Sequence, residues 1–164
     1  MKRIKYLLLL ILLLGIDQVT KYLARTAFMN GDSKTIIPNV LRLVYHENDG
    51  AAWGIFSGKS IFLIGLALLM TIFLVYIFFK LPLVTYYTPI RVLCVIVGAG
   101  AIGNNLIDRI IHGYVIDFIY FELIDFPVFN VADMYIVCGV FLCAAFIMFK
   151  YKENDFEFLK RKNK

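Results

Sequence analysis

Four runs of apolar residues, each about as long as a helix that crosses a membrane, divide this chain of 164 residues. We expect transmembrane helices at about residues 4–24, 59–79, 90–111 and 133–150. A helix needs about 20 apolar residues to span a hydrocarbon core of roughly 30 Å. Hydrophobic residues make up 61% of the chain, whereas soluble domains contain about one half. The sequence therefore predicts a single α-helical integral membrane domain, residues 1–164, with four transmembrane helices.

The first run could be mistaken for a secretory signal peptide, because M-K-R-I-K precedes a short apolar core. A small-x-small cleavage site does not follow, and the helical pattern continues through D-Q-V-T-K-Y-L-A. We therefore expect a retained first helix. Within it, Asp17 and Lys21 are four residues apart, so they share a helix face and can form an ion pair.

Two connections are long enough to carry structure of their own. In residues 25–58, the run Val40, Leu43, Val44 and Tyr45 favours strand, and a small sheet on the membrane surface is expected there. Residues 112–132 form the second connection. In the third apolar run, the glycines and alanines at 98–103 would let helix backbones approach closely.

The distribution of charge predicts the orientation of the chain. With four spans, both termini and the 80–91 loop lie on one side, and that side carries eleven of the seventeen Lys and Arg residues. Residues 17–79 and 92–133 hold six basic and nine acidic residues. By the positive-inside rule the termini, including a charged and solvated tail at 151–164, are cytoplasmic, and the acidic stretch 113–133 lies at the outer interface.

Composition and spacing argue against several other classes. The net charge of +5 comes from basic residues at the two ends rather than from an aromatic–basic nucleic-acid surface, so we expect no nucleic-acid partner. Cys94, Cys138 and Cys143 lie inside apolar runs without metal-ligand or disulfide spacing. His46 and His112 have no ligand-spaced partner. We therefore predict neither a metal nor a cofactor.

Two carboxylates, Asp117 in V-I-D-F-I and Asp133 in F-N-V-A-D-M, adjoin apolar segments. Acids at the edge of hydrocarbon are costly and indicate function. Two nearby carboxyls that share a proton can catalyse hydrolysis, because the ionised one activates water and the protonated one donates a proton. The residues alone leave open which pair converges among Asp108, Asp117, Asp125 and Asp133.

Five ordered segments make the chain resemble the bacterial lipoprotein signal peptidases, or signal peptidase II. These segments are D-Q-V-T-K at 17–21, N-D-G-A-A-W-G at 48–54, G-N-N-L-I-D-R at 103–109, G-Y-V-I-D-F at 113–118 and F-N-V-A-D at 129–133. The resemblance implies an aspartic endopeptidase of the bacterial cytoplasmic membrane. It would cleave prolipoproteins just before a cysteine that carries diacylglyceryl, with its active site at the outer leaflet. The implied fold adds an extracytoplasmic β-cradle at residues 25–58 and a loop with a short helix between the third and fourth spans.

The resemblance also assigns residues to the site. Asp117 and Asp133 match the catalytic pair, and Asn105 and Arg109 would hold the substrate backbone while Asp108 braces the site. The remaining matched positions are Asp17, Lys21, Asn48, Gly50, Ala51, Asn130 and Ala132. The implied partners are the lipidated prolipoprotein and membrane lipids, and we expect a monomer.

The sequence departs from the family pattern at one motif, and two other classes of protein are alternatives. The family pattern is G-N-x-x-D-R, whereas this chain has an additional residue, so that either Asn104 or Asn105 fills the position of the family asparagine. The N-x-x-D spacing favours Asn105, which would share a helix face with Asp108. A small proton-coupled transporter would place its acids in broken, repeated helices near the midplane, and a non-catalytic scaffold would bind partners without cleaving them.

Overall fold

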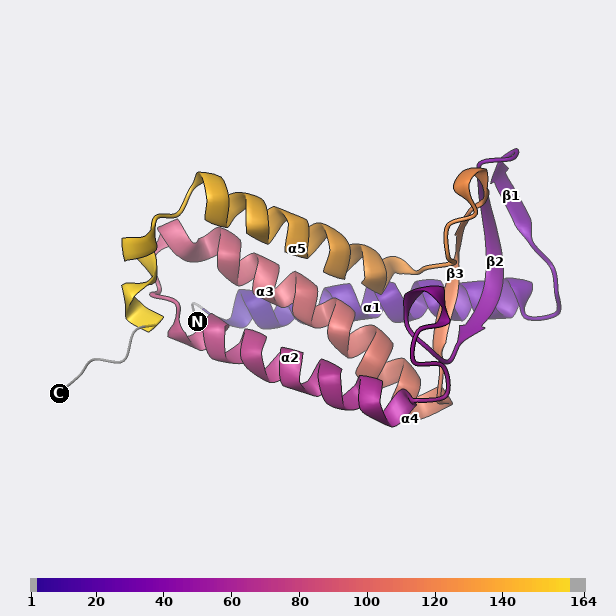
Figure 1. The fold of residues 1–164 in the computed structure, drawn as a ribbon, viewed down its shortest axis with the longest axis horizontal. Coiled ribbons are helices and arrows are strands. Elements are labelled where there is room, and N and C mark those ends of the chain that lie inside the picture. The colour runs from indigo at the N-terminus through magenta and orange to yellow at the C-terminus, as the bar shows by residue number, and fades with distance from the viewer. Residues whose placement is uncertain (1–2, 160–164) are drawn as a thin grey trace.

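Four helical segments run side by side along the long axis of the molecule (Figure 1), in a computed structural model that describes residues 3–159. They are α1 (Ile4–Phe28), α2 (Ser60–Lys80), a third segment between Thr85 and His112, and α5 (Val131–Phe149). Each is long and apolar enough to cross a membrane. The predicted four-helix membrane fold is confirmed.

The third segment is the most buried of the four. It comprises α3 (Thr88–Ala101), a π-helix (Ile102–Asp108) and α4 (Arg109–His112). The other helices present large apolar side chains outward, including Leu12, Leu69 and Phe141, which are 59%, 67% and 73% exposed. Such apolar outer faces are stable against lipid and would be unfavourable in water.

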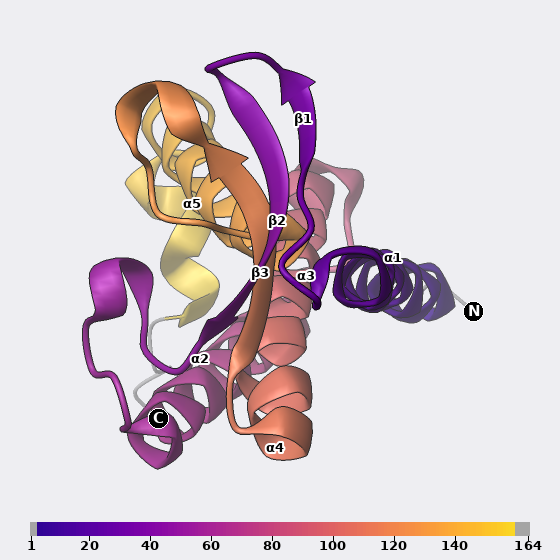
Figure 2. The ribbon, with the colours of Figure 1, turned by 90° about the vertical axis from the view of Figure 1, so that its right-hand side faces the viewer.

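A three-stranded antiparallel sheet closes one end of the bundle (Figures 1 and 2). Its order is β1 (Lys34–Ile37), β2 (Leu41–Asn48) and β3 (Val115–Phe121). The expectation that the sheet lies within residues 25–58 is wrong for its third strand, because β3 comes from the connection between the third and fourth spans. V-I-D-F-I-Y-F is rich in β-branched and aromatic residues, which fit a pleated, partly buried surface. The short helix expected in this connection is the single turn η4 (Glu122–Ile124).

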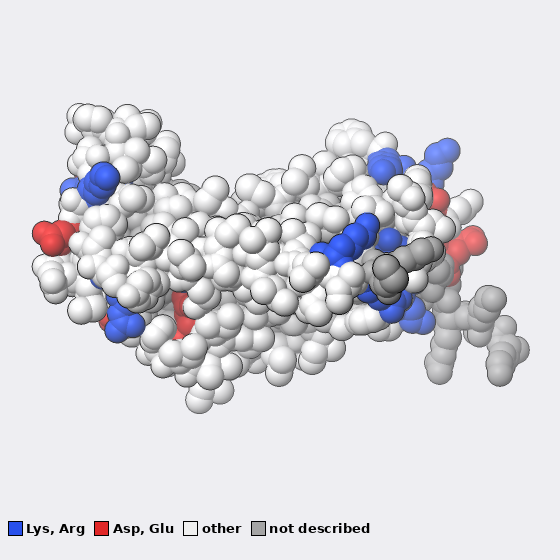
Figure 3. All heavy atoms as spheres, turned by 180° about the vertical axis from the view of Figure 1, so that it is seen from behind, with Lys and Arg blue, Asp and Glu red and all other residues white. Residues whose placement is uncertain are grey.

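The opposite end of the bundle carries both termini and gathers Lys and Arg side chains (Figures 1 and 3). There η2 (Thr85–Tyr87) and η5 (Glu153–Leu159) cap the helices. The expectation of a solvated tail is wrong at Tyr151, which is buried against Leu81, Tyr87 and Ile90 because its ring belongs to an apolar cluster. The basic residues Lys2, Lys160, Arg161, Lys162 and Lys164, used to predict the orientation, lie outside the described residues.

Candidate active site

Two carboxylates from different elements line one cavity of about 240 Å³ between the sheet and the bundle. Asp117 lies on β3, and Asp133 lies in the first turn of α5. The other two candidate acids are elsewhere: Asp108 pairs with Lys21 behind the cavity, and Asp125 accepts a hydrogen bond from Tyr120 in the loop after β3. The polar or small residues that also line the cavity are Asn48, Gly50, Ala51, Ala52, Asn104, Asn105 and Arg109.

Asn130 connects the two carboxylates. It is the N-cap of α5, and its side chain accepts a hydrogen bond from the Asp133 amide at 3.0 Å while Asp133 accepts from the Asn130 amide at 3.0 Å. This reciprocal pair is a capping box, which fixes the start of a helix. The Nδ2 of Asn130 donates to Asp117 at 2.6 Å. The fully buried Asn130 therefore fixes the positions of the two acids relative to each other.

Asp117 is nearly excluded from solvent, with 2% of its surface exposed. Its second carboxylate oxygen accepts a hydrogen bond from Asn48 at 2.8 Å. The pKa of Asp117 is raised to about 7, chiefly by burial and also by the charge of Asp133, while the hydrogen bonds from Asn48 and Asn130 oppose the change. A carboxyl with such a pKa can hold or release a proton near neutral pH, as a general acid or base requires.

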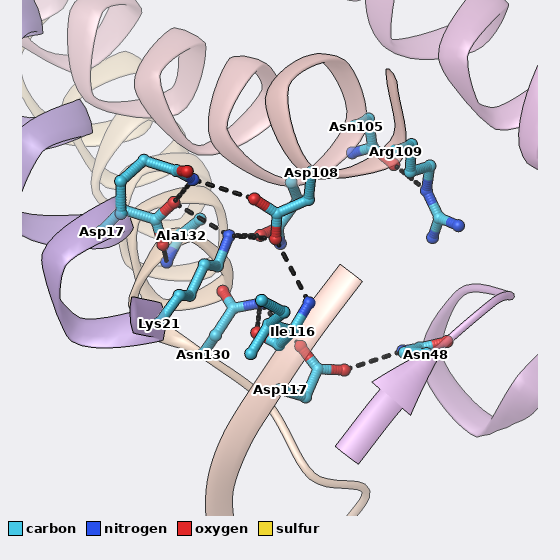
Figure 4. Close-up of polar contacts among 12 residues, drawn as sticks. Asp17, Lys21, Asn48, Asn105, Asp108, Arg109, Ile116, Asp117, Asn130 and Ala132 are labelled. Atoms are coloured by element: carbon cyan, nitrogen blue, oxygen red, sulfur yellow. Dashed lines mark hydrogen bonds and ion pairs between the residues drawn. The ribbon is translucent and has the colours of Figure 1, made fainter. Parts of the chain in front are cut away.

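A buried ionic network lies behind the acids (Figure 4). Lys21 on α1 contacts Asp17 at 2.9 Å and Asp108 at 2.8 Å, and it donates to Asn104 at 2.6 Å. Because every member is nearly fully buried, the charges must be paired to be tolerated. The network therefore fixes the start of β3 and the start of α5, since Asp108 accepts from the Ile116 amide at 3.2 Å and Asp17 accepts from the Ala132 amide at 3.1 Å.

Gln18 belongs to this network although the sequence did not single it out. Its side-chain amide donates to Asp17 at 3.1 Å and to Asp108 at 2.9 Å. It therefore joins two carboxylates that would otherwise repel each other. Its position inside D-Q-V-T-K, between two residues already assigned to the site, was the available signal.

The two asparagines of G-N-N-L-I-D-R have different contacts. Asn104 donates to Asp133 at 2.7 Å, and Asn105 accepts from Arg109 at 3.1 Å. Both lie in the π-helix, whose wider turn accommodates an additional residue relative to an α-helix. The departure from the family pattern thus coincides with this turn, which brings both asparagines to the cavity.

Arg109 crosses from the bundle to the loop after β2. One guanidinium nitrogen, Nη2, donates to the Gly50 carbonyl. Another, Nη1, is buried and finds no partner within residues 3–159. Gly50 itself has no room for a side chain, since an added Cβ would lie 2.9 Å from the Ile55 carbonyl oxygen. An unpaired donor in a cavity of this kind is available to a bound peptide carbonyl.

An apolar groove leads away from the cavity between α2, α3 and α5. Its volume is about 560 Å³, and Ala51 and Asn105 line both spaces. Leu63, Met70 and Ile147 are among the apolar side chains along it. The groove joins the lipid-facing surface of the bundle to the two acids.

Among residues 3–159, no three His, Cys, Asp or Glu side chains come together in a way that would hold a metal ion.

The fold and the site define a multi-pass membrane protein with a carboxylate-lined cavity at one end of its helices. Comparison with known proteins narrows this class. The sequence profile of signal peptidase (SPase) II matches residues 9–149.

The chain is 44% identical over 128 residues to the lipoprotein signal peptidase of Staphylococcus aureus strain JH9, covering 77% of each protein, and has the same identity to that of strain Newman. Two solved bacterial membrane enzymes are similar in structure. One has a TM-score of 0.79 at 36% identity, covering 98% of this chain and 93% of the other, and the second has 0.78 at 38%, covering 90% and 94%. This chain belongs to the signal peptidase II family. The predicted resemblance is confirmed, and the transporter and scaffold alternatives fall away.

Proposed function

We propose that Asp117 and Asp133 are the catalytic pair of this protein, and that it cleaves prolipoproteins just before their diacylglyceryl-modified cysteine. As a signal peptidase II, the chain is a membrane aspartic protease that removes signal peptides from prolipoproteins. The observation that carries the proposal is the shared cavity, in which Asn130 donates to both carboxyl groups, to Asp117 from its side chain and to Asp133 from its backbone amide.

Each acid accepts two hydrogen bonds, Asp117 from Asn48 and the Asn130 side chain, and Asp133 from Asn104 and the Asn130 amide. We assign the acids different roles on the raised pKa of Asp117. Asp117 has a pKa of about 7 and holds the shared proton near neutral pH. Asp133 then takes a proton from water as the water oxygen attacks the scissile carbonyl carbon, and Asp117 donates its proton to the carbonyl oxygen. Collapse of the tetrahedral intermediate breaks the C–N bond: the amine leaves with the proton held by Asp133, and one hydroxyl of the intermediate returns its proton to Asp117 as the C=O bond forms again.

The remaining residues would position the substrate. The apolar groove between α2, α3 and α5 has a lining that suits an apolar signal-peptide segment. Arg109 offers its free Nη1 to a peptide carbonyl, and Asn105 orients that guanidinium. Because the cavity lies where the sheet meets the bundle, the lipid chains of the substrate cysteine can remain in the membrane while its peptide bond reaches the acids.

The test is cleavage of a diacylglyceryl-modified prolipoprotein by the purified protein in detergent. Asp117→Asn and Asp133→Asn should each lower the rate by at least about a thousandfold, since each removes one proton-transfer group. Asp125→Asn is the matched control, because it neutralises an acid of the same connection whose side chain accepts a hydrogen bond from Tyr120 and lies outside the cavity of the two acids. Its rate should stay within about twofold of wild type. Full activity in either dyad variant would refute the assignment of that acid.

A further inference from the structure

A second polar cavity lies at the other end of the bundle, far along the molecule from the acids. Its volume is about 330 Å³, and it opens between the start of α1, the turn after α2 and the first turn of α3. The lining includes Lys5, Tyr6, Val84, Thr85, Thr88 and Arg91. Two of these residues are cations, two carry hydroxyls at the start of α3, and the lining contains no carboxylate.

Arg91 is the residue that this cavity leaves without a counter-charge. Its side chain is only 2% exposed, yet Nε and Nη2 have no hydrogen-bond partner in the described part of the chain. Its Nη1 reaches the Val84 carbonyl at 3.5 Å, the outer limit of a hydrogen bond. Lys21, which is equally buried, pairs with two carboxylates. A buried guanidinium with two free donors is costly, and an anion that accepts both donors would remove the cost.

The start of α3 adds to the positive potential of this cavity. Thr88 is the first residue of the helix, and the helix has no side-chain N-cap. The Thr88 amide already donates to the Thr85 carbonyl, and Pro89 has no amide hydrogen, so this helix start contributes its aligned peptide dipoles rather than free donors. These dipoles favour a negative group at this end. Arg91, Lys5 and the helix start therefore favour the same kind of ligand, a compact anion such as a phosphate group.

An apolar groove adjoins the cavity and indicates what the phosphate belongs to. This groove has a volume of about 430 Å³ between α1, α2 and α3, and Tyr6 lines both spaces. Leu7, Leu10, Phe78, Val95 and Gly98 are among its walls. A phosphate beside a channel of this composition matches a phospholipid, whose acyl chain can lie along the groove. Basic pockets between membrane helices are known binding sites for anionic lipid head groups.

We propose that this end of the protein binds one anionic phospholipid, with its phosphate on Arg91 and Lys5 and one acyl chain in the groove lined by α1, α2 and α3. The proposal is independent of the cleavage reaction, because none of these residues lines the cavity of the two acids. Lipid bound here would supply the counter-charge that Arg91 lacks and would hold the start of α1 against the start of α3.

The test is native mass spectrometry of the delipidated protein in a non-ionic detergent, titrated with phosphatidylglycerol. Wild-type protein should show one saturable lipid adduct, and Arg91→Gln should weaken it by about tenfold, the loss expected for a charge-assisted bond to phosphate. Lys80→Gln is the matched control, since it removes a positive charge from the same end outside both cavities and should leave the adduct unchanged. Equal binding by wild type and Arg91→Gln would overturn the proposal.

Three further arms keep the result decisive. If Arg91→Gln does not fold, Lys5→Gln replaces it and should weaken the adduct by roughly fivefold, whereas an unchanged adduct would count against the site. Phosphatidylcholine should bind at least about tenfold more weakly than phosphatidylglycerol, because its net charge is zero, and equal binding would refute selectivity for an anion. Inorganic phosphate at the lipid's concentration should not displace the lipid, since it cannot fill the groove. Displacement would show that the cavity takes free phosphate instead.

Discussion

Asn130 shows how a single side chain can determine the geometry of the two acids that we propose as the catalytic pair. It caps α5 through Asp133 and donates to Asp117 on β3, so it ties the position of one acid to the position of the other. An alanine at this place would lose the side-chain cap and the bond to Asp117, and it would keep the backbone amide that donates to Asp133. Loss of an N-cap costs about 1 kcal/mol, and loss of one of the two donors to the buried Asp117 carboxyl adds to that cost.

The proton held by Asp117 gives the first prediction. If the protonated form of Asp117 is the acid in catalysis, kcat/KM falls about tenfold per pH unit above the pKa of about 7, and it falls again at low pH once the base Asp133 is protonated. The measurement is the pH profile of cleavage between pH 5 and 9. A rate that rises through this range would contradict the assignment and would make Asp117 the base.

The same pKa of Asp117 predicts how the stability of the folded protein changes with pH, which can be measured independently of activity. The folded-state pKa of Asp117 lies above the ordinary aspartate value of 3.8, so the carboxyl stabilises the fold fully below pH 4 and loses this contribution as pH rises to about 7. The difference corresponds to at most about 4 kcal/mol. Wild type should therefore melt at a lower temperature at pH 8 than at pH 5, and Asp117→Asn should narrow this gap, because an amide does not titrate.

At the scale of elements, the π-helix separates the tasks of two neighbouring asparagines. Asn104→Ala should lower kcat by roughly tenfold or more, because Asp133 loses a donor and Lys21 loses a contact. Asn105→Ala should chiefly raise KM, because Arg109 loses the acceptor that orients it. Steady-state kinetics of the two variants separates these effects. Identical changes in kcat and KM would show that the asparagines do not have separate roles.

Close approach between α3 and α5 is a second property of elements, and two glycines of α3 form a matched pair. A Cβ on Gly100 would lie 2.5 Å from the Ala132 carbonyl oxygen, whereas nothing lies within 4 Å of one on Gly98. Gly100→Ala should push α5 away, destabilise the protein by about 1–3 kcal/mol and reduce activity. Gly98→Ala should leave the stability and the activity equal to those of wild type within experimental error. Thermal melting and cleavage rates test the pair, and equal effects would contradict the close approach.

For the whole molecule, the sequence was sufficient to predict the four membrane spans, and its ordered motifs were sufficient to predict the family. The spans follow from long apolar runs. Such a run crosses a membrane as a helix, because a helix pairs all of its backbone polar groups internally. The third strand was missed because V-I-D-F-I-Y-F is nearly continuous in apolar residues and lies beside a membrane span, so its sequence does not separate it from that span. It becomes a strand by pairing with β2, about 70 residues earlier in the chain. Likewise, the contact of Asn104 with Asp133 depends on a π-turn, which requires a backbone geometry that residue spacing does not encode.

The orientation of the whole molecule in the membrane is the last prediction. Lys and Arg gather at the end with the termini (Figure 3), and the sheet closes the opposite end, so the positive-inside rule places the sheet and the acids at the outer surface. In a variant without Cys94, Cys138 and Cys143, a cysteine at Lys34 on β1 should react with a membrane-impermeant maleimide in intact cells. A cysteine at Lys80, at the end of α2, should react only after the cells are permeabilised. Both positions are exposed, so the labelling pattern depends on sidedness, and the reverse pattern would place the acids in the cytoplasm, on the wrong side for a substrate that has crossed the membrane.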